Sequence, residues 1–251
     1  MKLALISLLF LAGFTGAQTC TASQEIASGF SLNQFRIVYP ATEKKGITWS
    51  MTNNTDRAYL MQSWIRPVDF TTGLPAAESN DKAFGGAIPL MVTPPLKRID
   101  SGEPLTLRIR LTSTALPQDR ESVFYLSVKG IPAMPDKASQ SDGRLVLAVV
   151  NNMKLFYRPE GLPEEGVKGA AKQLRFSLQN DVLVVDNPTP FYLNFSRLTV
   201  GGESLAADEL RRLVPPKGQQ RYPVSAGRRG AVEWQLLDED SLVTPLRRQT
   251  P

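Results

Sequence analysis

Short segments of alternating apolar and polar residues, separated by turn residues, follow one another along most of the chain. A period of two is typical of half-buried β-strands, so the pattern predicts an all-β protein. The first half contains seven predicted strands, at residues 35–39, 47–52, 59–66, 88–93, 105–111, 123–128 and 145–157. Seven short strands in succession are typical of an immunoglobulin-like β-sandwich.

A second set of predicted strands follows a segment rich in glycine, proline and glutamate at residues 159–169. These strands are expected at residues 174–178, 182–185, 191–200, 220–224 and 232–237. Residues 206–212 have room for one or two helical turns. Because clusters of Gly and Pro interrupt regular structure, 159–169 is the predicted linker. We therefore expect an N-terminal immunoglobulin-like domain over 29–158 and a C-terminal β-sandwich domain over 170–251.

The last strand of the first set is the longest and the most apolar. Residues 145–150 are apolar at six successive positions, and Pro159 closes the strand because proline cannot donate to a β-ladder. A strand that is apolar on both faces lies either in the middle of a sheet or at an open edge. An open apolar edge promotes aggregation unless a partner pairs with it. A binding function is therefore expected at this strand.

The composition excludes several classes of chemistry. The 251 residues include no histidine and a single cysteine, Cys20. Ser-His-Asp and Cys-His catalysis and most zinc sites need an imidazole, and a lone cysteine cannot form an intramolecular disulfide. The chain also has no P-loop and no Gly-x-Gly-x-x-Gly motif that would bind phosphate. We therefore expect neither an enzyme nor a bound metal or cofactor.

The first residues have the pattern of a secretory signal. Lys2 supplies a positive charge, and residues 3–14 are apolar but too few to span a bilayer. Small residues follow, so a signal peptide is expected over 1–22, with cleavage after Ala17 or Ala22. The later site would also remove Cys20. No other segment is apolar enough to cross a membrane, so we expect an exported protein without membrane insertion.

The charge of the chain changes this picture little. The formal net charge is +5, and arginine pairs stand at 211–212, 228–229 and 247–248. Short basic pairs are usually solvated loop charge. Because the chain is also expected to be exported, no nucleic-acid partner is predicted.

Four stretches of the chain resemble one known family. Residues 116–132, Leu-Pro-Gln-Asp-Arg-Glu-Ser-Val-Phe-Tyr-Leu-Ser-Val-Lys-Gly-Ile-Pro, closely resemble the signature of the periplasmic pilus-assembly chaperones of the chaperone–usher pathway. Residues 154–159 resemble the end of that family's long G1 strand, and 92–96 and 186–192 match further stretches common in it. The resemblance covers nearly all of the chain after the signal. Ser127 departs from the pattern, which usually has asparagine there.

The resemblance implies two immunoglobulin-like β-sandwich domains set at an angle, with a cleft between them. The implied client is a pilin subunit whose own sandwich lacks its last strand, and an outer-membrane usher receives the complex from the periplasm. The G1 strand fills the gap in the pilin. The side chains expected to enter the pilin groove are Leu145, Leu147 and Val149, and those expected to fill the chaperone's own core are Val146, Ala148 and Val150.

The resemblance also assigns charged residues. Arg36 and Lys154 match cleft residues that bind the C-terminal carboxylate of the pilin, a task that suits donor-only cations. Glu121, Arg158 and Asp238 match an interdomain salt-bridge network that sets the domain angle. Strict alternation puts Lys154 on the opposite face from Leu145, Leu147 and Val149. Either the strand bulges near residues 151–152, or the anchor and the groove residues use different faces.

Two other function classes are weighed against a chaperone. An exported β-sandwich adhesin or pilus component would lack the G1 strand or carry an N-terminal donor segment, and this chain has an intact G1 strand. An exported hydrolase would need converging acids, whereas the matched cleft residues are Arg36 and Lys154. The open edge is also compatible with a self-capping homodimer of the free protein.

Overall fold

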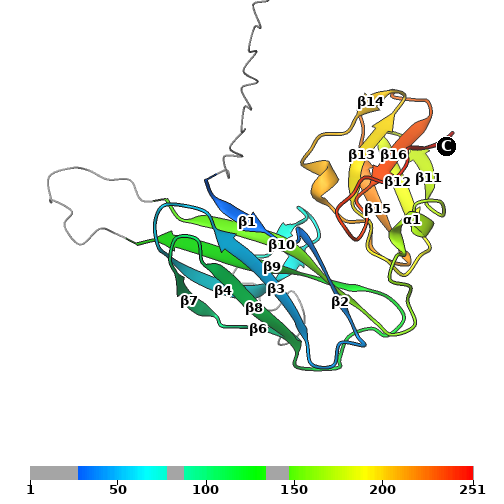
Figure 1. Ribbon diagram of the computed structural model, residues 1–251. Helices are drawn as coiled ribbons and strands as arrows, with labels where there is room; N and C mark the ends of the chain where they lie inside the picture. Colours follow the sequence, from blue (N-terminus) through cyan, green and yellow to red (C-terminus); the bar gives the residue numbers. More distant parts are fainter. Residues whose placement is uncertain (1–27, 78–87, 134–146, 251) are drawn as a thin grey trace, which may run out of the picture.

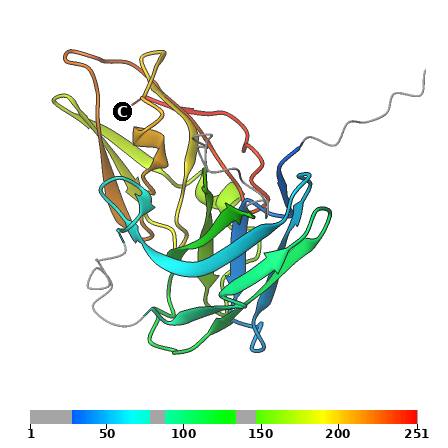
Figure 2. The same cartoon turned by 90° about the vertical axis from the view of Figure 1, so that its left-hand side faces the viewer.

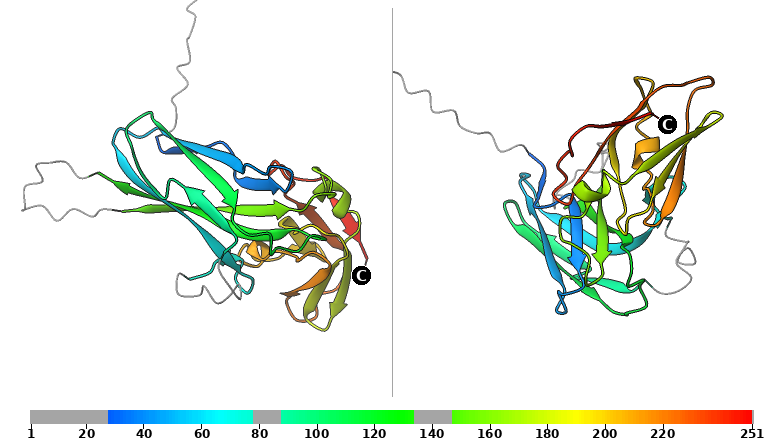
Figure 3. Two further views of the ribbon diagram at one scale, coloured as in Figure 1. Left: turned by 90° about the horizontal axis from the view of Figure 1, so that it is seen from below. Right: turned by 90° about the vertical axis from the view of Figure 1, so that its right-hand side faces the viewer.

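The chain folds into two β-sandwiches, which confirms the predicted all-β class. The computed structural model describes residues 28–77, 88–133 and 147–250, so the expected signal segment 1–22 lies outside the described residues. The second sandwich lies at one end of the first and at an angle to it (Figures 1, 2 and 3). Within the described ranges, no helix is both long and apolar enough to cross a membrane.

The first sandwich has two sheets of different size. One sheet has the order β1 (Phe30–Leu32), β3 (Ile47–Asn53), β8 (Pro104–Leu111), β6 (Leu90–Thr93). The other has the order β2 (Arg36–Pro40), β10 (Val149–Arg158), β9 (Ser122–Pro132), β4 (Tyr59–Asp69), β5 (Leu74–Pro75), with β7 (Leu96–Ile99) also beside β4. Neighbouring strands are antiparallel except β2 and β10, which are parallel.

Twice the chain crosses from one sheet to the other within a few residues. Between β1 and β2 it crosses at residues 33–35, where the indole N–H of Trp49 donates to the carbonyl of Gln34 at 3.0 Å. Between β6 and β7 it crosses at Pro94 and Pro95, which have no backbone N–H for a ladder. The alternating pattern did not predict β1 or β7, because strands of three or four residues give too few repeats of a period of two.

The core of the first sandwich follows the predicted alternation. On β3 and β8, the buried residues alternate with exposed or half-buried ones along each strand. The largest fully buried side chains of this core are those of Trp49, Phe124, Ile37, Met51, Met61, Leu107 and Leu126. A smaller cluster of Val68, Val123, Tyr125, Phe156 and Leu213 joins the first sandwich to the second.

The second sandwich has a three-stranded and a four-stranded sheet. The first has the order β11 (Arg175–Gln179), β12 (Val182–Asn187), β15 (Gly218–Pro223), and the second has the order β14 (Glu203–Ser204), β13 (Phe195–Val200), β16 (Val232–Leu236), β17 (Arg247–Gln249). The helix α1 (Val167–Ala170) follows the linker, and η2 (Glu209–Arg211) is a single 3-10 turn inside the predicted helical segment.

One predicted strand of the second sandwich starts later than the sequence pattern suggests. The pattern runs from 191 to 200, but β13 begins at Phe195. The side-chain amide of Asn187 donates to the carbonyls of Phe191 at 2.8 Å and Pro215 at 2.9 Å, so this segment is held as a turn. Local side-chain bonding to the backbone competes here with a β-ladder.

The turn after β2 supplies a test of the fold. Gly46 has a φ of +88°, and a Cβ atom there would lie 2.3 Å from the carbonyl oxygen of Ile109. Gly102 has a φ of +77°, with no heavy atom within 4 Å of such a Cβ. Gly102→Ala should cost about 1 kcal/mol of unfolding free energy from backbone strain alone. Gly46→Ala should cost about 3 kcal/mol, because a steric clash adds to the strain.

Urea unfolding of the two glycine variants measures the difference between them. Equal losses of stability at both positions would contradict the close approach of Gly46 to β8.

Candidate functional site

Half of β10 has an open backbone edge. The strand pairs with β9 along its whole length, from Val149 to Tyr157. On its other side it pairs with β2 only from Lys154 onward, because the chain joins this sheet at Arg36 after crossing from the other sheet. No strand among the described residues pairs with residues 149–153 on that side. The strand therefore combines the two arrangements that its sequence allowed, sheet centre at one end and open edge at the other.

The open part of β10 also carries exposed apolar side chains. Leu147 is 67% exposed and Val149 is 50% exposed. Met153 and Leu155, further along, are buried in the core of the first sandwich. Alternation puts Leu147 and Val149 on the same face as these core residues, at the end where little of the sandwich covers them. Leu145, the third residue expected in the pilin groove, lies outside the described residues.

The expectation that Ala148 and Val150 fill the chaperone's own core is wrong. Val150 is 42% exposed and Ala148 is exposed as well. The core face of β10 is the face of Met153 and Leu155, so every second residue from Ala148 to Lys154 points to the opposite side. Val146, which was expected to lie with them, is outside the described residues.

The structure shows that the expected anchor residue Lys154 and the expected groove residues lie on different faces of β10. From Val149 to Tyr157 the register with β9 advances one residue at a time, without the shift that a bulge would cause. Lys154 therefore points to the face opposite that of Leu147 and Val149. The cleft between the domains lies on the Lys154 face, because Lys154 contacts residues of the second sandwich there.

Arg36 and Lys154 face each other as register partners in the parallel pair of β2 and β10. The guanidinium of Arg36 is almost fully buried and stacks on the ring of Phe156, with Cζ 3.8 Å from the ring centroid. Its Nη2 donates a hydrogen bond to the carbonyl of Tyr192 at 3.4 Å. Its Nε has no hydrogen-bond partner within the described chain. Burial lowers the pKa of Arg36.

Lys154 lies half-buried at the same place. Its ammonium donates to the side-chain oxygen of Asn194, and to the carbonyl of Arg211 at 3.3 Å. Burial, and to a smaller extent the nearby positive charge of Arg36, lowers the pKa of Lys154 to about 8. Neither cation forms an ion pair with a carboxylate among the described residues. Two adjacent, partly desolvated cations without a direct ion pair have the chemistry that suits an anionic ligand.

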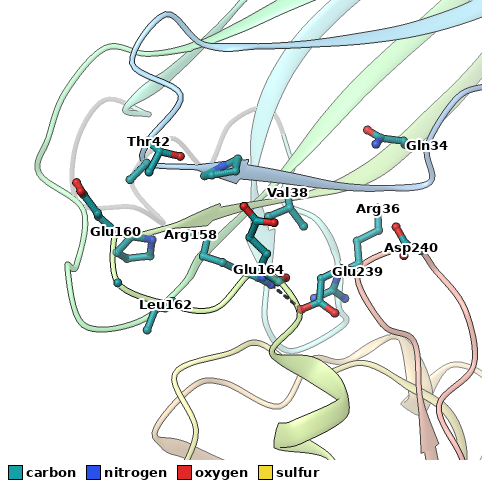
Figure 4. A pocket seen from close by; sticks show the side chains of 14 residues that line it. Gln34, Arg36, Val38, Thr42, Arg158, Glu160, Leu162, Glu164, Glu239 and Asp240 are labelled. Atoms are coloured by element: carbon teal, nitrogen blue, oxygen red, sulfur yellow. Dashed lines mark hydrogen bonds and ion pairs between the residues drawn. The ribbon is translucent and has the colours of Figure 1, made fainter.

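A buried ion cluster joins the two sandwiches next to these cations. Arg158 at the end of β10 pairs with Glu121 at 2.8 Å and with Glu239 at 2.9 Å. Glu121 in turn accepts a hydrogen bond from the backbone N–H of Tyr192 at 2.8 Å. The same guanidinium donates to the carbonyls of Pro163, at 2.9 Å, and Glu164 in the linker. Three parts of the chain thus converge on one side chain, and Figure 4 shows two of them, Glu164 of the linker and Glu239 of the second sandwich, beside Arg158.

The third member of the cluster is Glu239, whereas the sequence had assigned Asp238. The carboxylate of Asp238 points away and closes its own turn, where it accepts from the backbone N–H groups of Asp240 and Leu242 at 3.1 and 2.8 Å. It also pairs with Lys168 at 3.5 Å. Glu239 reaches Arg158 and accepts from the backbone N–H of Val167 at the start of α1. The side chains of consecutive residues point to different sides. An assignment that is wrong by one residue therefore selects a carboxylate with different partners.

Ser127 occupies the position where the family signature usually has asparagine. Its hydroxyl donates to the side-chain oxygen of Asn152 at 2.6 Å, directly across the β9–β10 pair. Ser127 itself is buried. The hydrogen bond therefore holds β10 to β9 beside its open edge, and it satisfies the buried hydroxyl of Ser127.

A cavity of about 350 Å³ opens at the domain junction between β2, the linker and the turn at residues 239–240 (Figure 4). Arg36 and Arg158 both line it, together with Glu239 and Asp240. The described residues contain no group of three or more side chains arranged to hold a metal ion. The cavity is thus lined by both cationic and anionic side chains.

Two family profiles match the chain one after the other. The profile of the pili and flagellar-assembly chaperone PapD N-terminal domain matches residues 29–163. The profile of the pili assembly chaperone PapD C-terminal domain matches residues 169–240. Together they span both sandwiches and end shortly before β17.

Curated relatives share about a third of their residues with this chain. The probable fimbrial chaperone SfmC of Escherichia coli K12 is 33% identical over 227 residues, which cover 90% of each chain. The Escherichia coli chaperone protein FocC is 37% identical over 207 residues, or 81% of each chain. Chaperone protein FimB/FhaD of Bordetella pertussis is 32% identical over 216 residues, covering 84% of this chain and 83% of its own.

Solved structures have the same architecture. A chain in the structure of the Salmonella enterica SafA pilin in complex with the SafB chaperone aligns with a TM-score of 0.73 and 26% identity, over 89% of this chain and 96% of its own. The Escherichia coli chaperone DraB aligns with a TM-score of 0.71 and 28% identity, over 89% of this chain and 98% of its own.

The ion cluster predicts a large loss of stability when its cation is removed. Arg158→Met leaves the buried carboxylate of Glu121 without a counter-charge and should lower the unfolding free energy by about 3–5 kcal/mol. The double variant with Glu121→Gln should recover part of this loss, because the fully buried carboxylate is then neutral, whereas Glu239 keeps its charge and only its backbone N–H donors. Arg98→Met, which breaks an exposed pair with Asp100, should change stability by less than about 1 kcal/mol.

Urea unfolding measures these variants, and small-angle X-ray scattering reports whether the domain angle persists. An Arg158→Met variant that is as stable as the wild type would show that Arg158 does not neutralise Glu121.

Lys154 should titrate near pH 8 in the free protein, well below its ordinary value of 10.5. Because this pKa is lower in the folded state, the buried charge destabilises the fold below about pH 8, and that penalty fades as the pH rises toward 10.5. Arg36→Met should raise the pKa of Lys154, but not to its ordinary value, because burial is the larger cause.

Side-chain NMR of Lys154 against pH measures both titrations. A Lys154 that titrates at its ordinary value in the wild type would refute its desolvation.

Proposed function

The chain belongs to the PapD family of pili-assembly chaperones, and we propose that it binds pilin subunits in the periplasm by lending them the open edge of β10. Its role is that of a chaperone in pilus assembly. The open edge of residues 149–153 is the single observation that carries the proposed mechanism. Exposed backbone N–H and C=O groups of an edge strand bind an incoming strand by β-strand addition.

The position of the cations gives the direction of the incoming strand. Arg36 and Lys154 stand at the end of the open edge, where β2 begins to pair with β10. A client whose C-terminal carboxylate binds there has its last strand along residues 149–153, ending at Lys154. That strand runs parallel to β10 and in line with β2. It therefore occupies the place that β2 leaves empty.

The apolar side chains of β10 contribute most of the affinity in this proposal. Leu145, Leu147 and Val149 enter the groove left by the missing strand of the pilin. Full burial of a side chain of this size is worth about 1.5–3 kcal/mol relative to exposure. The backbone hydrogen bonds add coverage and register, with a modest net energy, because they replace hydrogen bonds to water.

Arg36 and Lys154 are the carboxylate anchor in this proposal. Two charge-assisted hydrogen bonds to the terminal carboxylate fix the end of the client strand, and with it the register of every side chain along β10. A carboxylate between the two cations also relieves their mutual repulsion. Glu121, Arg158 and Glu239 do not contact the client in this proposal but hold the second sandwich against the cleft.

The usher is the partner that follows from this arrangement. We propose that an outer-membrane usher receives the chaperone–pilin complex, and that the next subunit then replaces β10 in the pilin groove. The same open edge makes a self-capping homodimer of the free chaperone a further expectation. A role as a structural pilus component gains no support, since β10 completes the first sandwich through residues 149–158.

The anchor is tested by co-expression with a candidate pilin and co-purification from the periplasm. Arg36→Ala and Lys154→Ala should each fold but lose most of the bound pilin, because loss of one partner in a desolvated charge pair costs about 2–5 kcal/mol. Lys44→Ala, which removes an exposed lysine paired with Glu160 on the surface, is the matched control and should retain the pilin.

The outcomes separate the family from the mechanism. Folded anchor variants that hold the pilin as well as the wild type would show that the anchor assignment is wrong. A wild-type protein that folds but holds no candidate pilin would count against the client itself.

A further inference from the structure

One phenylalanine beside the anchor is exposed although its neighbours on the same face are buried. Phe35, Ile37 and Tyr39 alternate along the first residues of the β2 segment. Ile37 is 1% exposed and Tyr39 is 2% exposed, whereas Phe35 is 68% exposed. A single exposed apolar residue is common on protein surfaces and needs no explanation by itself. Phe35 differs from such residues because its backbone is fixed and because it lies at the end of the open edge.

The backbone that presents Phe35 is held firmly. The backbone N–H of Asn33 donates to the carbonyl of Ser50 at 3.2 Å, and the side-chain oxygen of Asn33 accepts from the N–H of Ser50 at 3.1 Å. The carbonyl of Gln34 accepts from the fully buried indole of Trp49. These bonds fix the two residues before Phe35 to the neighbouring sheet. The ring therefore projects from a defined point of the sandwich.

That point is the end of the open edge. Arg36 is the register partner of Lys154, so Phe35 comes one residue before the pairing of β2 with β10 begins. Gln34, Arg36 and Val38 line the same cavity, so alternation puts Phe35 on the opposite face with Ile37, which is also the face of Leu147 and Val149. Three exposed apolar side chains thus flank the open edge on one face, while the anchor cations lie on the other.

We propose that Phe35 is a specificity-determining residue that contacts the last side chain of the client strand on this face and selects a large apolar or aromatic one. This inference rests on the proposed binding of a client strand along β10. That strand lies in line with β2, so its last side chain on the shared face is about 7 Å along the strand axis from Phe35, within reach of a phenyl ring. The terminal carboxylate binds on one face of the sheet, and Phe35 contacts a client side chain on the other face.

The chemistry of the contact follows from the ring. A phenyl group gains apolar area on contact with an aliphatic or aromatic side chain, and aromatic pairs add favourable edge-to-face geometry. The ring gains no comparable apolar contact with a charged side chain or with glycine. The anchor alone binds any C-terminal carboxylate, because every chain ends in one. Phe35 thus supplies discrimination that Arg36 and Lys154 cannot.

The test measures release of a co-purified candidate pilin into an excess of untagged wild-type chaperone. Phe35→Ala should speed release about tenfold, since most effects of interface substitutions are on the off-rate. Phe35→Leu should retain most of the effect. Met91→Ala, on β6 of the other sheet and 44% exposed, is the matched control and should release the pilin at the wild-type rate.

Alanine substitutions at each of the last four residues of the pilin, combined with Phe35→Ala, locate the contact. The inference requires that the effect of Phe35→Ala disappears for one pilin variant, at a position on the Leu147 and Val149 face, and persists for the others. An equal effect with every pilin variant would overturn it. So would release by Phe35→Ala within twofold of the wild type while Arg36→Ala still loses the pilin.

The proposed function fails in a different way. If the wild-type protein holds no candidate pilin, the strand-donation proposal is refuted and the role of Phe35 falls with it. Phe35 makes little contact with the core, so the variants should keep the wild-type urea midpoint. An altered midpoint for Phe35→Ala together with faster release of every pilin variant would assign the residue to stability instead.

Discussion

The unpaired backbone of residues 149–153 is the constraint on which the rest of this structure depends. An open apolar strand edge is unfavourable because no strand pairs with its outward-facing N–H and C=O groups. These groups need water or another chain as a partner. The edge arises because the chain spends its first three strand residues in one sheet and reaches the other only at Arg36. A β2 that began five residues earlier in this sheet would cover β10 completely. The crossing at residues 33–35, held by Trp49 and Ser50, thus creates the open edge.

The second sandwich supplies hydrogen-bond acceptors for the two cations at the end of that edge. Lys154 depends on Asn194 and the carbonyl of Arg211, and Arg36 depends on the carbonyl of Tyr192, all of which belong to the second sandwich. The domain junction therefore contributes the acceptors that keep both cations in place. The ion cluster around Arg158 has the geometry to fix the two sandwiches, since its partners come from the first domain, the linker and the second domain. A buried ionic cluster of this kind specifies an arrangement more than it adds stability.

Much of the fold could be predicted from the sequence, and the errors have physical causes. Alternation located β3 and β8 to within about a residue because one face of each is buried and the other solvated. It missed β17, whose three residues pair with β16 but give too short a pattern. Resemblance supplied Arg36 and Lys154, and the structure brings them together. It put Asp238 in place of Glu239, because in a run of three acidic residues after β16 only the backbone path shows which carboxylate turns inward. Tyr192 lay in a matched stretch but had no assigned role, and Asn194 gave no signal, since their parts depend on contacts across about 40 residues or more.

The continuity of β10 has a consequence for how such a chain can change over evolutionary time. One strand carries the open edge, Lys154 and Arg158, the last two four residues apart on the same face. Inserting or deleting a single residue between Val149 and Arg158 would invert every side chain beyond it, turning Lys154 or Arg158 into the apolar core. The spacing between the open edge and the domain junction is therefore frozen. Such a chain can exchange side chains along β10, but it cannot change the length of that strand without losing either the edge or the junction.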